Sequence, residues 1–204
     1  MRDGEGDGME EVNGRGIDEQ KIEENGWIKV LALITGIAVM TIPFTGSWWI
    51  LKFAEVLIFE FSPFDMRLEF LGESVEIPAI QYALLSFKIL IVISGIFIVI
   101  GALTNKWWSR HLLRFGAGKP AWFVLGILIT VVLFIPLNSY LQNMDIPFQL
   151  PIYGEKTVSF QQENIRVSFK IVSKFTESFI YALIVSILGL YVRFKIKPLP
   201  PKKV

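Results

Sequence analysis

The sequence predicts an α+β membrane protein in which a bundle of four transmembrane helices carries a small extracytoplasmic antiparallel β-sheet as a cap. Three observations lead to this fold class. Hydrophobic residues make up 52% of the 204 residues and gather in four nearly charge-free runs. Two longer stretches between these runs alternate apolar and polar residues with the period of two that is typical of strands. Two shorter segments next to the runs are basic and contain no acid, which indicates how the chain is threaded.

The apolar runs predict the helices. They cover residues 30–51, 77–104, 120–144 and 178–192. A helix needs about 20 apolar residues to cross a hydrocarbon core of about 30 Å. The first three runs are long enough, and the fourth must draw neighbouring residues into the membrane. We therefore expect a membrane domain over residues 27–196, with helices at about 27–51, 79–105, 120–142 and 175–194.

Charge sets the expected orientation. The loop at 105–119 and the segment at 193–204 contain basic residues and no acid, whereas the two long loops, taken together, contain more acids than bases. Because basic loops stay on the cytoplasmic side, we expect both termini in the cytoplasm. The β-rich loops at 52–78 and 145–174 then lie outside.

The tryptophans agree with this threading. All six fall near expected membrane boundaries, where amphipathic rings anchor a protein. The inner anchors are Trp27, Trp107, Trp108 and Trp122, and the outer anchors are Trp48 and Trp49. In the inner loop, Arg110 and Arg114 are expected to face anionic lipid headgroups.

The two terminal segments have biased compositions. Residues 1–26 contain nine acids, three bases and six glycines, and this composition predicts a disordered cytoplasmic tail. Such a tail is either a solvated chain end or a recruiter of a basic partner. Residues 197–204 form a basic, proline-rich cytoplasmic tail.

The alternating stretches predict the cap. In the second outer loop, Ile165, Val167, Phe169 and Ile171 alternate with polar residues, and TVSFQ does the same upstream. In the first outer loop, AEVLIFEF, MRLEF and VEIP are separated by turn-like segments. We expect three strands in the first loop and two in the second. Because ribbons of two or three strands are marginal alone, the five should form one sheet on the helix ends.

This layout resembles the claudin-type tetraspan arrangement, in architecture alone, over residues 27–195. Four helices, a large first outer loop and a sheet drawn from both outer loops carry the resemblance. The sequence departs from that family's W-GLW motif, because Trp48 and Trp49 are adjacent, and from its cysteine pair, because there is no cysteine. No residue role is therefore transferred.

Small residues recur at helical spacing in two of the runs. Helices in lipid associate through such residues because their backbones can approach closely. These residues allow either packing of the helices within the bundle or binding to another protein. The residues concerned are Ala32, Gly36, Ser178, Ala182, Ser186 and Gly189.

Lys88 is the only charge inside the second apolar run. With a helix that starts near Gln81, Lys88 lies about 10 Å below the outer boundary. Its side chain can snorkel to the headgroups or pair with Glu177 in the first turn of the fourth helix. A Lys88–Glu177 pair either locks two helices together or forms an ion or substrate site, because charges inside a membrane often mark such sites.

Composition also narrows the function. A net charge of +1 argues against binding nucleic acid by bulk electrostatics, and the absence of cysteine excludes thiolate chemistry. The single histidine, His111, has no carboxylate nearby in sequence, so we expect no catalytic, metal or cofactor site. We predict a non-enzymatic scaffold, assembly or accessory subunit that contacts lipids and a membrane-protein partner or further copies of itself. The alternative is a small oligomeric channel or transporter that uses Lys88 and Glu177, and a membrane enzyme ranks third.

Overall fold

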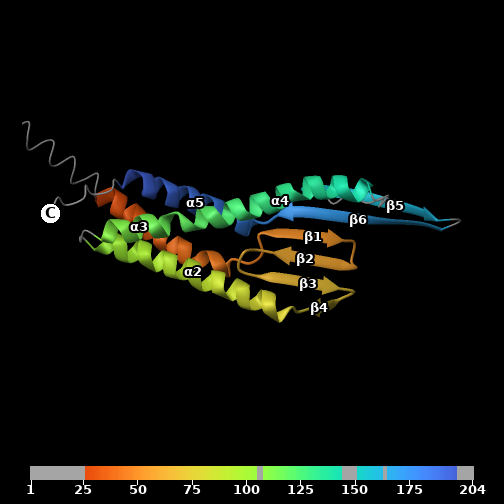
Figure 1. The fold of residues 1–204 in the computed structure, drawn as a ribbon, viewed down its shortest axis with the longest axis horizontal. Helices are drawn as coiled ribbons and strands as arrows, with labels where there is room; N and C mark the ends of the chain where they lie inside the picture. The colour runs from red at the N-terminus through yellow and green to blue at the C-terminus, as the bar shows by residue number, and fades with distance from the viewer. Residues whose placement is uncertain (1–25, 105–107, 144–150, 163–164, 197–204) are drawn as a thin grey trace, which may run out of the picture.

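The computed structural model describes residues 26–104, 108–143, 151–162 and 165–196. Helices form one end of an elongated molecule and a β-sheet forms the other (Figure 1). We call the sheet with its turns, residues 49–75 and 154–175, the cap. The two predicted terminal tails, apart from Gly26, and the expected anchor Trp107 lie outside the described residues.

Within the described residues, four helical segments are long and apolar enough to cross a membrane. The second segment, α2, opens with proline at its first position, where the missing N–H costs nothing. The third segment combines two helices, α3 and α4, that meet at Gly118. The segments are the N-terminal helix Gly26–Phe44, α2 Pro78–Leu103, α3 Ser109–Ala117 with α4 Lys119–Asn143, and α5 Glu177–Lys195.

The N-terminal helix is shorter than the sequence predicts. A 3-10 turn, η1 Ile42–Phe44, closes the helix, and Gly46 follows with a φ of +97°, a conformation that favours glycine. The strand β1 Trp49–Phe53 occupies the last residues of the expected helix. Strand pairing on both sides of β1 outweighs the apolar run here, because each backbone group finds a partner in the sheet.

Helix α3 replaces most of the inner loop expected at 105–119. It lies against the end of α2, where a Cβ added to Gly101 would be 2.8 Å from the backbone oxygen of Ser109. The hydroxyl of Ser94 in α2 donates to the backbone oxygen of Gly116, at 2.8 Å. Small residues on both helices allow this approach, so the segment packs as part of the bundle.

Six strands form one antiparallel sheet in the order β4-β3-β2-β1-β6-β5. The two loops join where β1 pairs with β6, with Trp49 opposite Phe175. The prediction of a single sheet from both loops is confirmed, although the first loop supplies four strands instead of three. The strands besides β1 are β2 Leu57–Phe61, β3 Met66–Phe70, β4 Glu73–Val75, β5 Gly154–Gln162 and β6 Ile165–Phe175.

An aromatic cluster joins the cap to the bundle. The ring of Trp48 is fully buried and makes edge contacts with Phe64 at 5.6 Å and Phe179 at 6.0 Å between centroids. Phe64 sits in the turn between β2 and β3, and it also contacts Phe123 of α4, at 5.0 Å. The hydroxyl of Ser62 accepts the Asp65 N–H at 2.9 Å and holds this turn closed. The turn is therefore inserted between the helix ends, which seats the sheet on the bundle.

Candidate functional site

The strand register gives the cap an apolar and a polar face. Residues that pair across strands point to the same side of a sheet. The apolar face carries Trp49, Leu51, Phe53, Leu57, Phe59, Phe61, Met66, Leu68, Phe70, Val75, Val158, Phe169, Ile171 and Phe175. The polar face includes Lys52, Glu60, Arg67, Glu69, Lys170 and Lys174.

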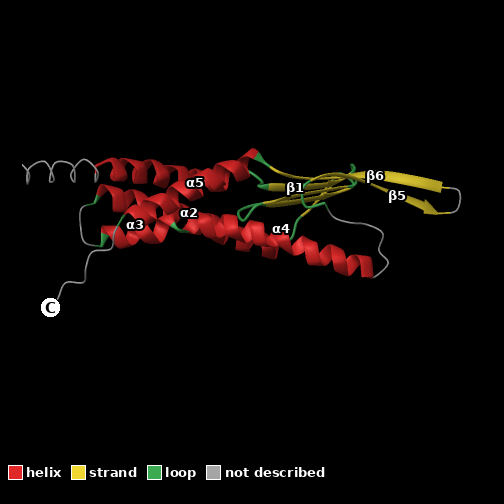
Figure 2. Cartoon of the chain, turned by 90° about the horizontal axis from the view of Figure 1, so that it is seen from above, coloured by secondary structure: helices red, strands yellow, loops and turns green. Residues whose placement is uncertain are grey.

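Helix α4 covers one half of the apolar face. Figure 2 shows α4 continuing past the bundle along the sheet. The ring of Phe134 contacts Trp49 with centroids 5.4 Å apart, and both Trp49 and Ile171 are buried. The Trp49 indole N–H donates to Ser173 Oγ at 2.9 Å, and that hydroxyl donates to the backbone oxygen of Ile152 at 2.8 Å. We call the part of the sheet made by β1, β6 and β5 the covered half.

The other half of the apolar face ends in an exposed hairpin. Strand β4 is an outer strand of the sheet, and its three residues are all exposed. Phe70 and Val75 point to the apolar face but are 48% and 43% exposed, and Leu71 in the turn is 67% exposed. We call β3, β4 and their turn, residues 66–75, the edge hairpin.

The turn of the edge hairpin has an unfavourable residue. Leu71 and Gly72 both have positive φ, 53° and 84°, as in the tight turns that join antiparallel strands. Asparagine and glycine suit the first of these positions, whereas leucine is uncommon there. Leu71 thus combines a costly backbone conformation with an exposed apolar side chain. Such outliers are expected where function requires the side chain.

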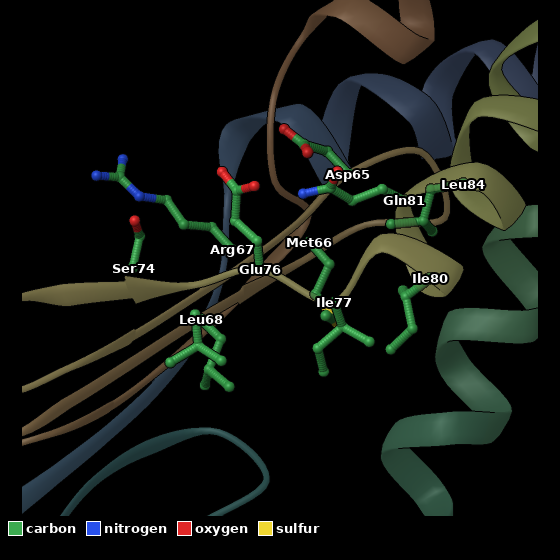
Figure 3. Close-up of a pocket in the computed structure, with 11 residues that line it drawn as sticks. Asp65, Met66, Arg67, Leu68, Ser74, Glu76, Ile77, Ile80, Gln81 and Leu84 are labelled. Atoms are coloured by element: carbon green, nitrogen blue, oxygen red, sulfur yellow. The ribbon is translucent and has the colours of Figure 1, made fainter.

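A recess of about 330 Å³ lies where the edge hairpin meets the start of α2 (Figure 3). Figure 3 shows the apolar side chains of Met66, Leu68, Ile77 and Ile80 on one side of the backbone. The polar groups of Asp65, Glu76 and Gln81 lie on the other side. The recess therefore offers an apolar wall next to hydrogen-bonding groups, in the combination found in ligand and side-chain pockets.

The polar side of the recess is acidic. Arg67 lines the recess but points away from Gln81 in Figure 3, and it forms an ion pair with Glu69. The other charged groups that line the recess are the carboxylates of Asp65 and Glu76. A group that binds here would meet apolar contacts and two acids, so a basic residue with a long aliphatic stem fits this chemistry.

Lys88 and Glu177, the predicted charge pair, are not brought together. Within the described residues they form no ion pair, and the Lys88 ammonium instead lies 6.0 Å from the centre of the Phe44 ring. Glu177 is exposed at the first turn of α5. The early end of the N-terminal helix places Phe44 beside Lys88, and no local pattern in the sequence indicates this contact.

The predicted small residues lie at contacts within the bundle. Ala32 and Ala182 are fully buried, and Ser186 is buried with its hydroxyl bonded to the backbone oxygen of Ala182, at 2.7 Å. A Cβ added to Gly36 would be 3.1 Å from the backbone oxygen of Gly95 in α2. A Cβ at Gly189 would be 2.5 Å from the backbone oxygen of Ala117 in α3, so α5 and α3 touch closely there.

The cap end of α5 is fastened to the chain that follows the N-terminal helix. Ser178 donates its hydroxyl hydrogen to the backbone oxygen of Thr45, at 2.5 Å. Thr176, just before the helix, does the same to the backbone oxygen of Ser47, also at 2.5 Å. These bonds hold the two outer loops together at the base of the sheet.

Trp48 and Trp49 are expected from the sequence to anchor the outer membrane boundary. The structure instead buries both of them in contacts within the protein. They lie after the end of the helix, where the sheet and the bundle enclose them. Trp27 and Trp122 are exposed, and Trp108 is half-buried at the start of α3. Arg110 is exposed and Arg114 is half-buried on α3.

Sequence reasoning missed the role of Trp49 and the exposure of Leu71. The segment WILKF alternates as a strand does, but it continues an apolar run, and that run predicts a helix. Pro43 and Gly46 were the available signals for an earlier helix end. The segment LGES, between MRLEF and VEIP, has the composition of a turn, but only the torsion angles show that its leucine takes the left-handed position.

No protein-family model matches this chain, and no curated protein sequence matches it.

Proposed function

We propose that this protein is a non-enzymatic assembly or accessory subunit of a membrane complex, and that it recognises a partner protein through the edge hairpin and its recess. The observation that carries the proposal is the edge hairpin itself. It presents an outer strand, three exposed apolar side chains and a leucine in a costly backbone conformation at one place.

The contact we propose is strand addition. The outer side of β4 can pair with an extended segment, since outer strands carry backbone groups that accept another strand. Phe70, Leu71 and Val75 would then contact apolar residues of that segment. The acids Asp65 and Glu76 at the recess favour a segment that also carries lysine or arginine. The proposed partner is therefore an extended apolar segment with a basic residue, from another membrane protein.

Site-specific crosslinking tests this contact. The chain contains no cysteine, so a single introduced cysteine can carry a photoreactive maleimide. Ser74→Cys places the probe on β4, and Thr157→Cys is a matched control, because it is an exposed residue on the opposite outer strand β5. The probes are activated in native membranes, and the products are identified by mass spectrometry.

We expect Ser74→Cys to yield one stoichiometric product with a distinct membrane protein and Thr157→Cys to yield none. Adding Leu71→Asn to Ser74→Cys should lower that yield about tenfold, as loss of a central apolar contact does at interfaces. Equal products from both positions would contradict the proposal. A product made only of two copies of this chain would replace accessory function with self-assembly.

We also propose that the cap is extracytoplasmic and that both termini are cytoplasmic. The helix ends far from the cap carry basic residues, and the described carboxylates lie in the cap, at Glu76 directly after it, or at the first turn of α5, which supports this orientation through the positive-inside rule. An impermeant maleimide added to intact cells should label Thr157→Cys. It should label Phe194→Cys, at the other end of α5, only after the membrane is opened. The reverse pattern would invert the proposed topology.

A further inference from the structure

The end of the bundle opposite the cap is basic. Along the described parts of the chain, no carboxylate occurs at this end, whereas five basic residues do. Helices that are far apart in sequence contribute them, and these helix ends meet on the left in Figure 1. We call this surface the basic end; its residues are Lys29, Arg110, Arg114, Arg193 and Lys195.

Packing places Arg193 at the joint of α3 and α4, next to Lys119. The guanidinium of Arg193 from α5 lies against Gly118, where α3 and α4 meet, and a Cβ at that glycine would collide with it. The Lys119 ammonium lies 4.3 Å from the centre of the Phe115 ring. In α5, the Lys195 ammonium lies 5.8 Å from the Tyr191 ring. Within the described residues, Arg193, Lys119 and Lys195 form no ion pair, so their charges are available to an anion.

The chain itself supplies a strongly acidic segment next to this surface. Residues 1–25 contain nine acidic and three basic side chains, a net charge of −6. The segment is joined to the N-terminal helix at Gly26, three residues before Lys29 of the basic end. A short tether gives a segment an effective concentration in the millimolar range, so opposite charges here meet without a second molecule.

We propose that the acidic segment, residues 1–25, binds the basic end of its own chain and competes there with anionic lipid headgroups. The complementarity of charge and the attachment point favour this occupant over an acidic partner protein. The inference concerns the end of the molecule opposite the edge hairpin, and it does not depend on the proposed accessory function.

Crosslinking within one molecule tests the inference. The full chain carries Gly14→Cys in the acidic segment and Phe194→Cys on α5, whose native side chain is exposed at the basic end. It is placed as a single copy in nanodiscs of phosphatidylcholine, which has no net charge. A short bis-maleimide is added, and the linked peptides are measured by mass spectrometry. Gly14→Cys with Thr157→Cys, on the cap, is the pair that should not link.

We expect the yield to fall at least about fivefold at about 1 M salt, where the screening length is about 3 Å. Arg110→Gln with Arg114→Gln should lower the yield about threefold at low salt. The matched control, Lys52→Gln with Lys174→Gln, removes the same charge from the cap and should leave the yield unchanged. Replacing the lipid by anionic phosphatidylglycerol should also lower the yield, because headgroups then compete for the same cations.

Two results would overturn the inference. A yield that is insensitive to salt and to Arg110→Gln with Arg114→Gln would show that the two cysteines meet only because they are tethered. An undetectable yield in phosphatidylcholine would show that the segment does not reach the basic end, which would then be a surface for anionic lipid alone.

Discussion

The covered half of the cap and the edge hairpin follow the same alternation of residues and end in opposite environments. Trp49 and Ile171 are buried beneath α4, whereas Phe70 and Val75 on the same face are about half exposed. Both halves obey the rule that one face of a strand is apolar. The difference arises because α4 crosses only one half. An apolar face therefore indicates that something should cover it, and in the edge hairpin we propose that a partner does.

Trp49→Ala should produce the largest effect and test the covered half directly. It removes the ring that packs on Phe134 and the donor to Ser173, so we expect a loss of about 3–5 kcal/mol in unfolding free energy. Phe70→Ala, on the same face of the edge hairpin, should cost less than about 1 kcal/mol. Denaturation in detergent, followed by circular dichroism, measures both. Equal losses of unfolding free energy would mean that packing of α4 on the covered half does not make its residues more important for stability than those of the edge hairpin.

Ser173→Ala sharpens the comparison at a single hydrogen bond. It leaves the buried indole N–H of Trp49 without its acceptor, and an unsatisfied buried donor costs about 1–3 kcal/mol. Ser74→Ala removes the same hydroxyl from exposed β4 and should change stability by less than about 0.5 kcal/mol. The same denaturation assay compares the two, and a harmless Ser173→Ala would show that water replaces the lost bond.

Leu71→Asn separates folding from recognition in the edge hairpin. Asparagine suits positive φ better than leucine, so stability should stay the same or rise by up to about 1 kcal/mol. The Ser74→Cys crosslink to the proposed partner should nevertheless fall. Tyr153→Asn is the control, because it removes an exposed ring outside the edge hairpin and should leave the crosslink intact. A stable Leu71→Asn variant with a full crosslink would show that the leucine has no role in binding.

Lys88→Met should have the smallest effect. Its contact with Phe44, at 6.0 Å, is at the outer limit for a cation above a ring, so we expect a change of less than about 0.5 kcal/mol. This substitution tests α2, the helix that follows the edge hairpin, and leaves the hairpin itself unchanged. A loss of several kcal/mol would point to a buried charge pair. Unchanged stability with altered ion flux would instead revive the channel alternative.

The sequence by itself determined four apolar helices, the alternation of β2, β3, β4 and β6, and the concentration of basic residues at one set of helix ends. These features are local: hydropathy, period and charge can be read along the chain without knowing its neighbours. Tertiary structure alone decided that WILKF is a strand, because that depends on β2 and β6 lying beside it. It also decided that Lys88 meets Phe44 and that α4 buries one half of the sheet and leaves the edge hairpin exposed. Contacts of this kind join residues remote in sequence, and no local pattern specifies which remote partner a side chain will find.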